Sequence, residues 1–311
     1  MNRPDTLQSV TAGPHCAAVG FFDGVHLGHA ALLRDLSRLA DERGERALAI
    51  TFDRHPRVVV QADYVPELLT TTDEKVELLA LRGVECAVLT FDQAMAALSA
   101  REFMQTILRV KYNVKTLLVG YDHHFGRPQG ETFADYARMG ADLGIDVLRA
   151  EPFLMDGSPV SSSRIRRCLA DGDVEAASRM LGRPYGFSAR VVHGRHVGTS
   201  LGFPTANFAT ADLAKLLPAN GSYLVRVNSQ SSVLHGMLYV GTRPTFDASG
   251  RTAEVHLFDT NADFYGQTLR VDFLCRLRQE RRFENAEALR RQLEADRAEA
   301  LRLLETINPK E

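Results

Sequence analysis

The chain has 311 residues, a formal net charge of −2, 45% hydrophobic residues and 24% charged residues. This length allows two domains that each bury a core, and the composition is that of a soluble globular protein. The nearly balanced charge disfavours proteins that bind nucleic acid or acidic membranes through a basic surface. We therefore expect any phosphate to be bound at a local site.

Cysteine usage and the N-terminus indicate the compartment. Cys16, Cys86, Cys168 and Cys275 are widely separated, form no C-x-x-C pair, and are predicted to be reduced core residues. Residues 1–10 lack the apolar segment of a signal peptide, and no apolar run approaches the length that spans a membrane. We expect a cytoplasmic protein.

Short apolar runs alternate with helical patterns in the first half of the chain. The runs predicted to be strands are residues 16–22, 47–52, 86–91, 115–120 and 145–149. Capping-box spacing at residues 71–74 and 99–102 predicts the starts of two intervening helices. This alternation predicts an α/β fold with a parallel sheet, whose ligands bind beyond the carboxyl ends of the strands.

The first predicted strand leads into the sequence AAVGFFDGVHLGH at residues 17–29, which predicts a strand, a glycine turn and a helix start. His26 and His29 are spaced i, i+3 where free N–H groups and the helix dipole favour an anion. Gly28 lets a nucleotide approach the backbone, and Asp23 stands at a ligand-facing strand end. We interpret the segment as a phosphate site; the alternative is a strand, turn and helix with surface histidines.

Other polar segments follow later strands of the same predicted sheet. They are TFDRHP at residues 51–56 and GYDHHFG at residues 120–126, and both are expected at its carboxyl edge. The sequence VSSSRIRR at residues 160–167 predicts a helix start whose hydroxyls, N–H groups and arginines suit a triphosphate or pyrophosphate. The alternative for that segment is a serine N-cap followed by solvated arginines.

The chain changes character after Gly182-Arg183-Pro184, which predicts a hinge between domains 1–182 and 183–311. The strand-like segments beyond it are residues 187–192, 223–227, 236–240, 253–258 and 268–274. Close spacing and turn residues predict an antiparallel barrel or sandwich. Residues 284–307 are predicted to form a charged amphipathic helix.

Two motifs in this second half can carry chemistry. In GRHVGTSLGFPTAN at residues 194–207, closely spaced glycines let a backbone wrap a phosphate chain. The Thr205 hydroxyl and the Asn207 amide offer oxygen ligands for Mg²⁺. The alternative is an ordinary glycine-rich loop.

The second motif is EVHLFD at residues 254–259. Strand alternation puts Glu254 and His256 on one face and Val255 and Leu257 on the other. A carboxylate held at Glu254 could take a proton from a substrate hydroxyl. The alternative is an ordinary half-exposed strand.

Together these motifs resemble the bacterial bifunctional riboflavin kinase and FAD synthetase family, in which an adenylyltransferase domain precedes a kinase domain. DGVHLGH at residues 23–29 is shared with other adenylyl- and cytidylyltransferases. LGFPTAN at 201–207 followed by EVHLFD at 254–259 is far more specific to riboflavin kinases. The resemblance extends from about residue 19 to the C-terminal helix.

The resemblance implies an N-terminal Rossmann-like nucleotidyltransferase domain, then an antiparallel β-barrel kinase domain with a C-terminal helix. It implies that riboflavin is phosphorylated to FMN and that FMN is adenylylated to FAD with release of pyrophosphate. Mg²⁺ is the implied cofactor and ATP the co-substrate. The implied partners are riboflavin, FMN, FAD and ATP, without nucleic acid or membrane; the oligomeric state stays open and self-association is allowed.

The resemblance also implies roles for residues. His26 and His29 would hold the ATP phosphates, and Glu254 would act as the general base of the kinase. Thr205 and Asn207 would bind the Mg²⁺ of MgATP. The other implied cofactor-binding residues are Phe22, Asp23, Gly24, Gly28, Asp122, Ser162, Ser163, Arg164, Gly198, Gly202 and Pro204.

Some positions depart from the family pattern. The family often has Asn at Phe21, Asp-Asp-Phe-Arg at residues 121–124, Thr at Ser163 and Arg at Thr199. These departures leave the reaction types intact and concern the flavin contacts near residue 121 and an arginine contribution at Thr199.

Two other functions remain as alternatives. One is a nucleotidyltransferase of other specificity or a relative of class I aminoacyl-tRNA synthetases. A tRNA ligase should carry a basic anticodon-binding module, and we see no such module in the sequence of the second domain. The other is a non-catalytic flavin- or nucleotide-binding regulator. Such a regulator would be expected to keep the glycines and lose the charged and chelating residues. This chain has all of the latter: His26, His29, Thr205, Asn207 and Glu254.

Overall fold

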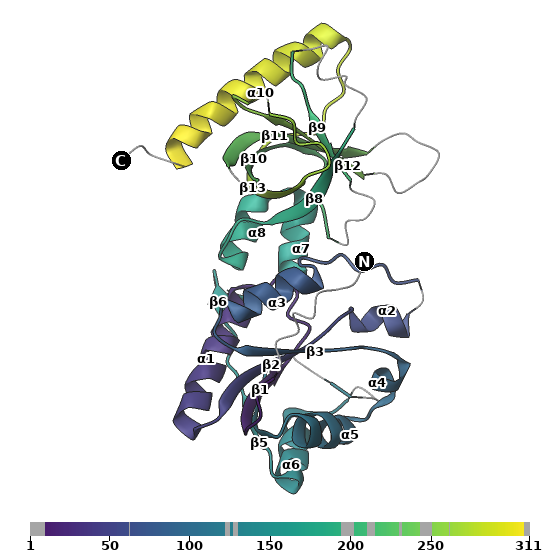
Figure 1. Ribbon diagram of the computed structural model, residues 1–311, viewed down its shortest axis with the longest axis vertical. Coiled ribbons are helices and arrows are strands. Elements are labelled where there is room, and N and C mark those ends of the chain that lie inside the picture. Colours follow the sequence, from purple (N-terminus) through teal and green to yellow (C-terminus); the bar gives the residue numbers. More distant parts are fainter. Residues whose placement is uncertain are drawn as a thin grey trace. The chain divides into compact units, whose positions relative to one another are not determined.

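The computed structural model describes residues 10–61, 63–121, 125–126, 130–193, 202–209, 215–229, 232–242, 251–260 and 262–307. The chain divides into two compact units, Met1–Ser162 and Ser163–Glu311 (Figure 1). The segment expected as a hinge lies within the second unit. There the Arg183 N–H donates to Ser178 O at 3.2 Å and the Phe273 N–H donates to Tyr185 O at 2.8 Å.

A parallel five-stranded sheet of order β3-β2-β1-β4-β5 forms the centre of the first unit. Its strands are β1 (His15–Val19), β2 (Arg46–Phe52), β3 (Glu85–Leu89), β4 (Val114–Val119) and β5 (Asp146–Arg149). All five strands predicted from apolar runs are confirmed. The strand order reverses between β1 and β4, and open α/β sheets bind their ligands at such a switch point.

Helices connect these strands, and a small hairpin follows β5. They are α1 (Leu27–Arg43), α2 (Pro56–Val60), α3 (Thr72–Ala80), α4 (Gln93–Ala97), α5 (Ala100–Phe103), the π-helix η1 (Met104–Lys111), α6 (Phe133–Leu143), β6 (Leu154–Met155) and β7 (Ser158–Pro159). Both predicted capping boxes are present, at Thr71 with Glu74 and at Ser99 with Glu102. Each begins a helix by satisfying N–H groups that have no partner within the helix.

Helices cover both faces of the sheet (Figure 1). On one face α1 and α3 bury Leu36 and Leu79 against Cys16. On the other face α5, η1 and α6 bury residues such as Phe103 and Tyr136. Because both faces are covered, the strand ends remain as the place for a ligand.

The second unit is built around a closed antiparallel barrel of order β10-β11-β12-β9-β8-β13. Its elements are α7 (Ser162–Asp171), α8 (Val174–Leu181), β8 (Gly186–Val192), β9 (Ala206–Phe208), β10 (Gly221–Asn228), β11 (Val233–Thr242), β12 (Arg251–Leu257), β13 (Thr268–Gln279) and α10 (Ala286–Ile307). The five predicted strands are confirmed, and the structure resolves the choice between sandwich and barrel in favour of a barrel. Strand β9 was not predicted.

The C-terminal helix α10 packs on the outside of the barrel. Leu293 and Leu301 belong to the same apolar cluster as Leu224 of β10. Arg278 of β13 and Asp296 of α10 form a largely buried ion pair at 2.8 Å. The predicted amphipathic helix is therefore confirmed, and it covers one side of the barrel.

Candidate active sites

The turn after β1 has an unusual backbone. Phe22 and Val25 have φ values of 51° and 38°, and Gly24 has 83°. Positive φ is uncommon for bulky residues such as phenylalanine and valine, so surrounding contacts must hold this turn. The Thr51 side chain donates to Phe21 O at 3.1 Å, and the Val25 N–H donates to Phe22 O at 3.1 Å.

Asp23 anchors this turn from inside. Its side chain is buried and accepts hydrogen bonds from Leu69 N at 3.0 Å, Thr70 N at 3.0 Å and Thr70 Oγ1 at 3.2 Å. The Gly24 N–H also donates to Thr70 Oγ1 at 3.0 Å. We expected Asp23 to face a ligand. In the structure its carboxylate accepts hydrogen bonds from residues 69 and 70 and so helps to hold the turn in place.

His26 and His29 meet at the start of α1. His26 is the N-cap, and its Nδ1 accepts the His29 N–H at 3.3 Å. The two imidazole rings stack with centroids 3.6 Å apart and planes 16° apart. Phe22 packs edge-on against His29 at 5.2 Å. The predicted histidine pair is therefore brought together where the helix presents its free N–H groups.

Gly28 is packed closely from one side. A Cβ there would lie 3.0 Å from Val160 O and 3.1 Å from the His26 ring. The sequence argument gave Gly28 a role in admitting a nucleotide, and packing inside the protein is an additional reason for glycine. The segment that carries Val160 also places Ser162, whose Oγ donates to Asp23 O at 2.8 Å.

The other predicted residues of the first site are only partly placed. Ser163 and Arg164 continue α7 into the second unit, where Ser163 is exposed and Arg164 half-buried. Asp122 lies outside the described residues. The Tyr136 hydroxyl of α6 donates to Phe125 O at 2.9 Å.

Lys75 is a buried residue at this edge that our sequence reasoning missed. Its side chain is 2% exposed, and Nζ donates to Phe52 O at 2.8 Å, 4.1 Å from the centre of the Phe21 ring. Burial lowers the pKa of Lys75 to about 8, against the attraction of Asp23 and Asp53. In the sequence Lys75 simply follows the capping box at residues 71–74, and that position does not distinguish a buried lysine from a solvated one.

In the barrel, Glu254 stands between two side chains on the same face. Asn207 of β9 lies directly opposite it on one side and Tyr239 of β11 on the other. Side chains of such cross-strand pairs are neighbours. Asn207 is buried, whereas Glu254 is half-buried. The Tyr239 hydroxyl donates to Glu280 Oε1 at 2.6 Å, and burial together with this bond raises the pKa of Tyr239.

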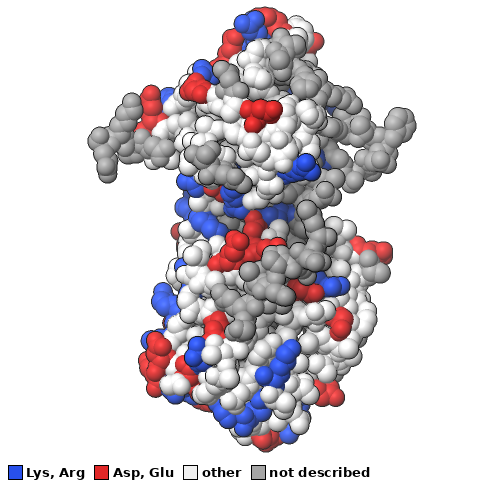
Figure 2. Space-filling model, viewed as in Figure 1, with Lys and Arg blue, Asp and Glu red and all other residues white. Residues whose placement is uncertain are grey.

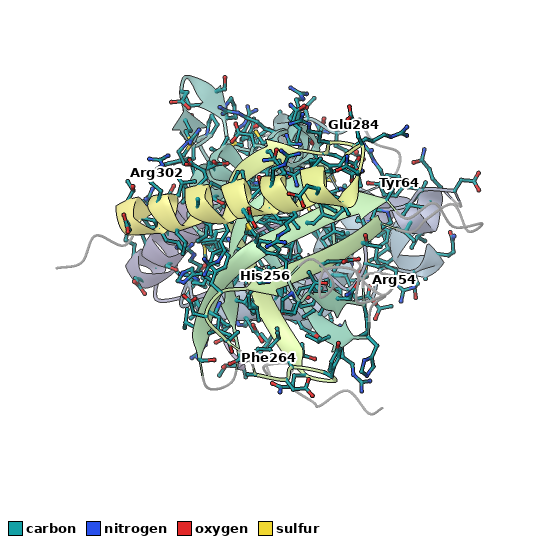
Figure 3. The ribbon with its side chains drawn as sticks, turned by 90° about the horizontal axis from the view of Figure 1, so that it is seen from above. Arg54, Tyr64, His256, Phe264, Glu284 and Arg302 are labelled. Atoms are coloured by element: carbon teal, nitrogen blue, oxygen red, sulfur yellow. The ribbon has the colours of Figure 1, made fainter. Side chains whose placement is uncertain are left out.

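Two cavities flank β12. One of about 320 Å³ is bordered by Thr205, Val255 and Phe264. The other, of about 830 Å³, is bordered by residues of α10 such as Arg297 and by His256, which is labelled in Figure 3. Along β12 (Arg251–Leu257), Val255 is buried whereas Glu254 and His256 on either side of it are half-buried, so the predicted alternation is confirmed for these three residues; Leu257 borders both cavities.

His256 links the strand to the segment that carries Thr205. Its Nδ1 donates to Pro204 O at 2.9 Å, because a carbonyl oxygen can only accept. Burial lowers the pKa of His256 despite this bond. Gly202, just before this segment, has φ +83°, which explains a glycine there. Gly198 lies outside the described residues.

Within the described part of the chain, no group of three or more His, Cys, Asp or Glu could hold a metal ion. Across the same residues, no helix is both long and apolar enough to cross a membrane. The four cysteines, all of them described, are free thiols.

The first unit has a parallel sheet and a helix start that favours anions, and the barrel places Asn207 opposite Glu254. Matches to two protein families define the class, a transferase that uses nucleotides in two units. The FAD synthetase family model matches residues 9–164 and the riboflavin kinase model matches residues 181–304. The chain belongs to the bifunctional riboflavin kinase/FMN adenylyltransferase family.

Relatives of this family match nearly the whole chain. The bifunctional riboflavin kinase/FMN adenylyltransferase of Escherichia coli K12 is 35% identical over 280 residues, 89% of each chain. That of Pseudomonas fluorescens is 36% identical over 286 residues, 91% of each chain. A solved structure from Streptococcus pneumoniae, described as a macrolide-efflux protein, is 32% identical with a TM-score of 0.84, covering 94% of this chain and 95% of its own.

The membership gives the reactions. The enzyme phosphorylates riboflavin to FMN with ATP and adenylylates FMN to FAD with release of pyrophosphate. Three expectations are confirmed: the fold class, the order of the adenylyltransferase and kinase domains along the chain, and ATP as co-substrate.

Proposed function

We propose that adenylyl transfer takes place at the start of α1, where His26 and His29 stabilise charge on the α-phosphate of ATP and on the departing pyrophosphate. The observation that carries this proposal is the stacked histidine pair at a helix N-terminus. The phosphate of FMN is already ionised, so it can attack without a general base. The task of the site is then electrostatic, which suits imidazoles and free N–H groups.

The rest of this site is proposed from the family resemblance, although Ser163 and the segment around Asp122 depart from the family pattern. The backbone of Phe22, Gly24 and Gly28 would border the nucleotide, with Asp23 holding the turn that they form. Ser162, whose hydroxyl already contacts that turn, would begin the phosphate-binding segment. The further members of this proposed set are Asp122, Ser163 and Arg164.

For the kinase, we propose that Glu254 draws the proton from the 5′-hydroxyl of riboflavin as the oxygen attacks the γ-phosphate of ATP. The position of Glu254 directly opposite Asn207 supports this role, because it keeps the carboxylate beside a polar group of the same face. Its half-buried side chain is open enough to reach a substrate. Positioning and charge neutralisation would supply most of the acceleration.

Mg²⁺ is proposed as the cofactor of the kinase site. The Thr205 hydroxyl and the Asn207 amide are neutral oxygen donors of the kind that Mg²⁺ uses together with substrate phosphates and water. Such a site needs no cluster of carboxylates or histidines. When bound, the ion would supply positive charge beside the phosphates. The backbone at Gly198, Gly202 and Pro204 would then border the phosphate chain.

The Mg²⁺ proposal is tested by Thr205→Val, which keeps the shape of the side chain and removes its oxygen. We expect more Mg²⁺ to be needed for half-maximal riboflavin phosphorylation, while supplied FMN is adenylylated as before. Thr268→Val, at an exposed position of β13, is the matched control. An unchanged Mg²⁺ requirement in Thr205→Val would exclude the hydroxyl as a ligand.

We also propose that the enzyme works in the cytoplasm on free flavins and ATP, without nucleic acid or membrane. The net charge of −2 gives no general attraction to polyanions. On the face shown in Figure 2, basic and acidic residues occur in small groups of both signs. The domain division at residues 182 and 183 likewise remains a proposal.

A further inference from the structure

Lys75 is a buried cation that neither reaction uses in the scheme above. It lies in the first turns of α3 with 2% of its surface exposed. Its Nζ donates to Phe52 O, at the end of β2, and faces the ring of Phe21, after the end of β1. Burying an ammonium group is unfavourable unless its partners compensate, so a lysine here calls for a function.

The charges around Lys75 come from three elements. Asp23 follows β1, Asp53 follows β2, and Cys86 belongs to β3. Burial raises the pKa of the Cys86 thiol to about 11, so this group is neutral over most of the working range. The hydrogen bond from Phe91 N to Asp53 at 3.0 Å keeps the pKa of that carboxyl low despite burial. Of these three groups, the two carboxyl groups are therefore the ones that attract the Lys75 ammonium electrostatically while the thiol stays neutral.

These contacts join the ends of two strands where the turn needs support. Phe22 and Val25 hold strained positive φ values, and the residue after Val25 is the N-cap His26. A turn of this kind persists only when surrounding contacts fix it. The ammonium attracts Asp23 within the turn, packs on Phe21 before it and holds the end of β2 beside it.

We propose that Lys75 is a positioning residue for adenylyl transfer: its ammonium holds the turn at residues 21–25 against the end of β2 and so sets the direction of His26 and His29. This inference rests on the proposed role of the two histidines. Lys75 itself is too deeply buried to touch the substrate.

Charge, and not bulk, carries this role. A neutral amine would fill the same space but lose the attraction to the carboxylates and to the face of Phe21. The pKa of Lys75 is lowered to about 8 from an ordinary 10.5, so the charge is lost on raising the pH through about 8. Adenylyl transfer should therefore fall above that pH.

Stability should change in the opposite direction. Between about pH 8 and 10.5 the unfolded chain keeps the proton on Lys75 while the folded chain loses it. The unfolded state then binds more protons, so the contribution of this group to the free energy of unfolding rises with pH in that window. A loss of activity without a loss of stability separates positioning by charge from simple packing.

The test compares the full-length wild type with Lys75→Met, which keeps the length of the side chain and removes the charge. Adenylylation of supplied FMN, phosphorylation of riboflavin and thermal unfolding are measured from pH 7 to pH 10. We expect Lys75→Met to adenylylate roughly ten- to a hundredfold more slowly at pH 7, as for a small misplacement of reacting groups. It should lack the decline above pH 8, retain kinase activity, and lack the rise in stability that titration of Lys75 gives the wild type above about pH 8.

Controls make every outcome decisive. Lys111→Met, at an exposed position of η1, should behave as the wild type. A folded Lys75→Met enzyme with wild-type adenylylation, or with an unchanged decline above pH 8, would overturn the proposal. If Lys75→Met does not fold, Lys75→Arg tests the proposal, because arginine keeps its charge throughout this pH range. Adenylylation by this variant should not decline near pH 8, and a decline like that of the wild type would overturn the proposal.

The failure of this inference differs from the failure of the proposed histidine site. Normal adenylylation by His29→Ala would remove the histidine role, whatever Lys75 does. An intact histidine effect with no effect of Lys75→Met would remove only the positioning role.

Discussion

His29→Ala separates the chemistry of the adenylyl site from the stability of its helix. The substitution removes one imidazole but keeps the backbone N–H that His26 Nδ1 accepts at 3.3 Å. The N-cap of α1 therefore survives. We expect the free energy of unfolding to change little and the rate of FAD formation to fall.

The magnitude follows from the contacts that are lost. Removing one donor that stabilises developing charge lowers a rate about a hundred- to a thousandfold, or about 3–4 kcal/mol of activation free energy. His26→Ala removes a donor and also the cap, so it should additionally lose about 0.5–2 kcal/mol of stability. Because the rings stack at 3.6 Å, the double variant should lose much less than the product of the two effects.

The assay supplies FMN and ATP and follows FAD and pyrophosphate, with riboflavin phosphorylation by the same preparation as the internal control. His235→Ala, on β11 of the barrel, is a matched histidine deletion that should leave adenylylation intact. Near-normal FAD formation by folded His29→Ala would refute the reasoning. So would a parallel loss of both activities, since the kinase residues lie in the other unit.

Two predictions concern the barrel. Glu254→Gln keeps the shape and one oxygen but removes the base, so riboflavin phosphorylation should drop roughly a hundredfold or more while supplied FMN is still adenylylated; near-normal phosphorylation would leave Glu254 only an orienting or structural role. A fragment of residues 183–311 contains Thr205, Asn207 and Glu254 and should convert riboflavin to FMN and no further. The longer fragment 163–311 keeps α8 and all of α7 except Ser162, including the bond from Ala219 N to Leu169 O at 2.8 Å, and should unfold at a higher temperature. FAD from either fragment would show that the adenylyl site is misplaced.

Most of the fold could be predicted because most strands have a recognisable local sequence pattern. The strands of the first unit are short apolar runs between helical patterns, as expected for a sheet covered on both faces. Strand β9 could not be found in this way. It has three residues, follows a glycine-rich segment, and exists because β8 and β12 offer it partners on both sides.

The candidate site residues could be predicted where their spacing along the chain brings them together. They could not be predicted where residues from distant segments make the contacts. The i, i+3 spacing of His26 and His29 was enough to bring them together at a helix start. The partners of Asp23 are 46 and 47 residues away, and no local pattern shows that they take up its carboxylate. The burial of Lys75 likewise depends on Phe21 and Phe52, which the capping box around it cannot reveal.

Strand β9 is the shortest strand of the barrel, and the barrel closes through it. Asn207 pairs with Val192 of β8 on one side and with Glu254 of β12 on the other, so it belongs to both ladders. An ATP–metal complex held at this residue would therefore fasten the seam of the barrel. Its arrival should slow amide hydrogen exchange in residues 206–208. The rate of amide hydrogen exchange in β9 would then indicate whether the kinase site is occupied before any phosphate is transferred.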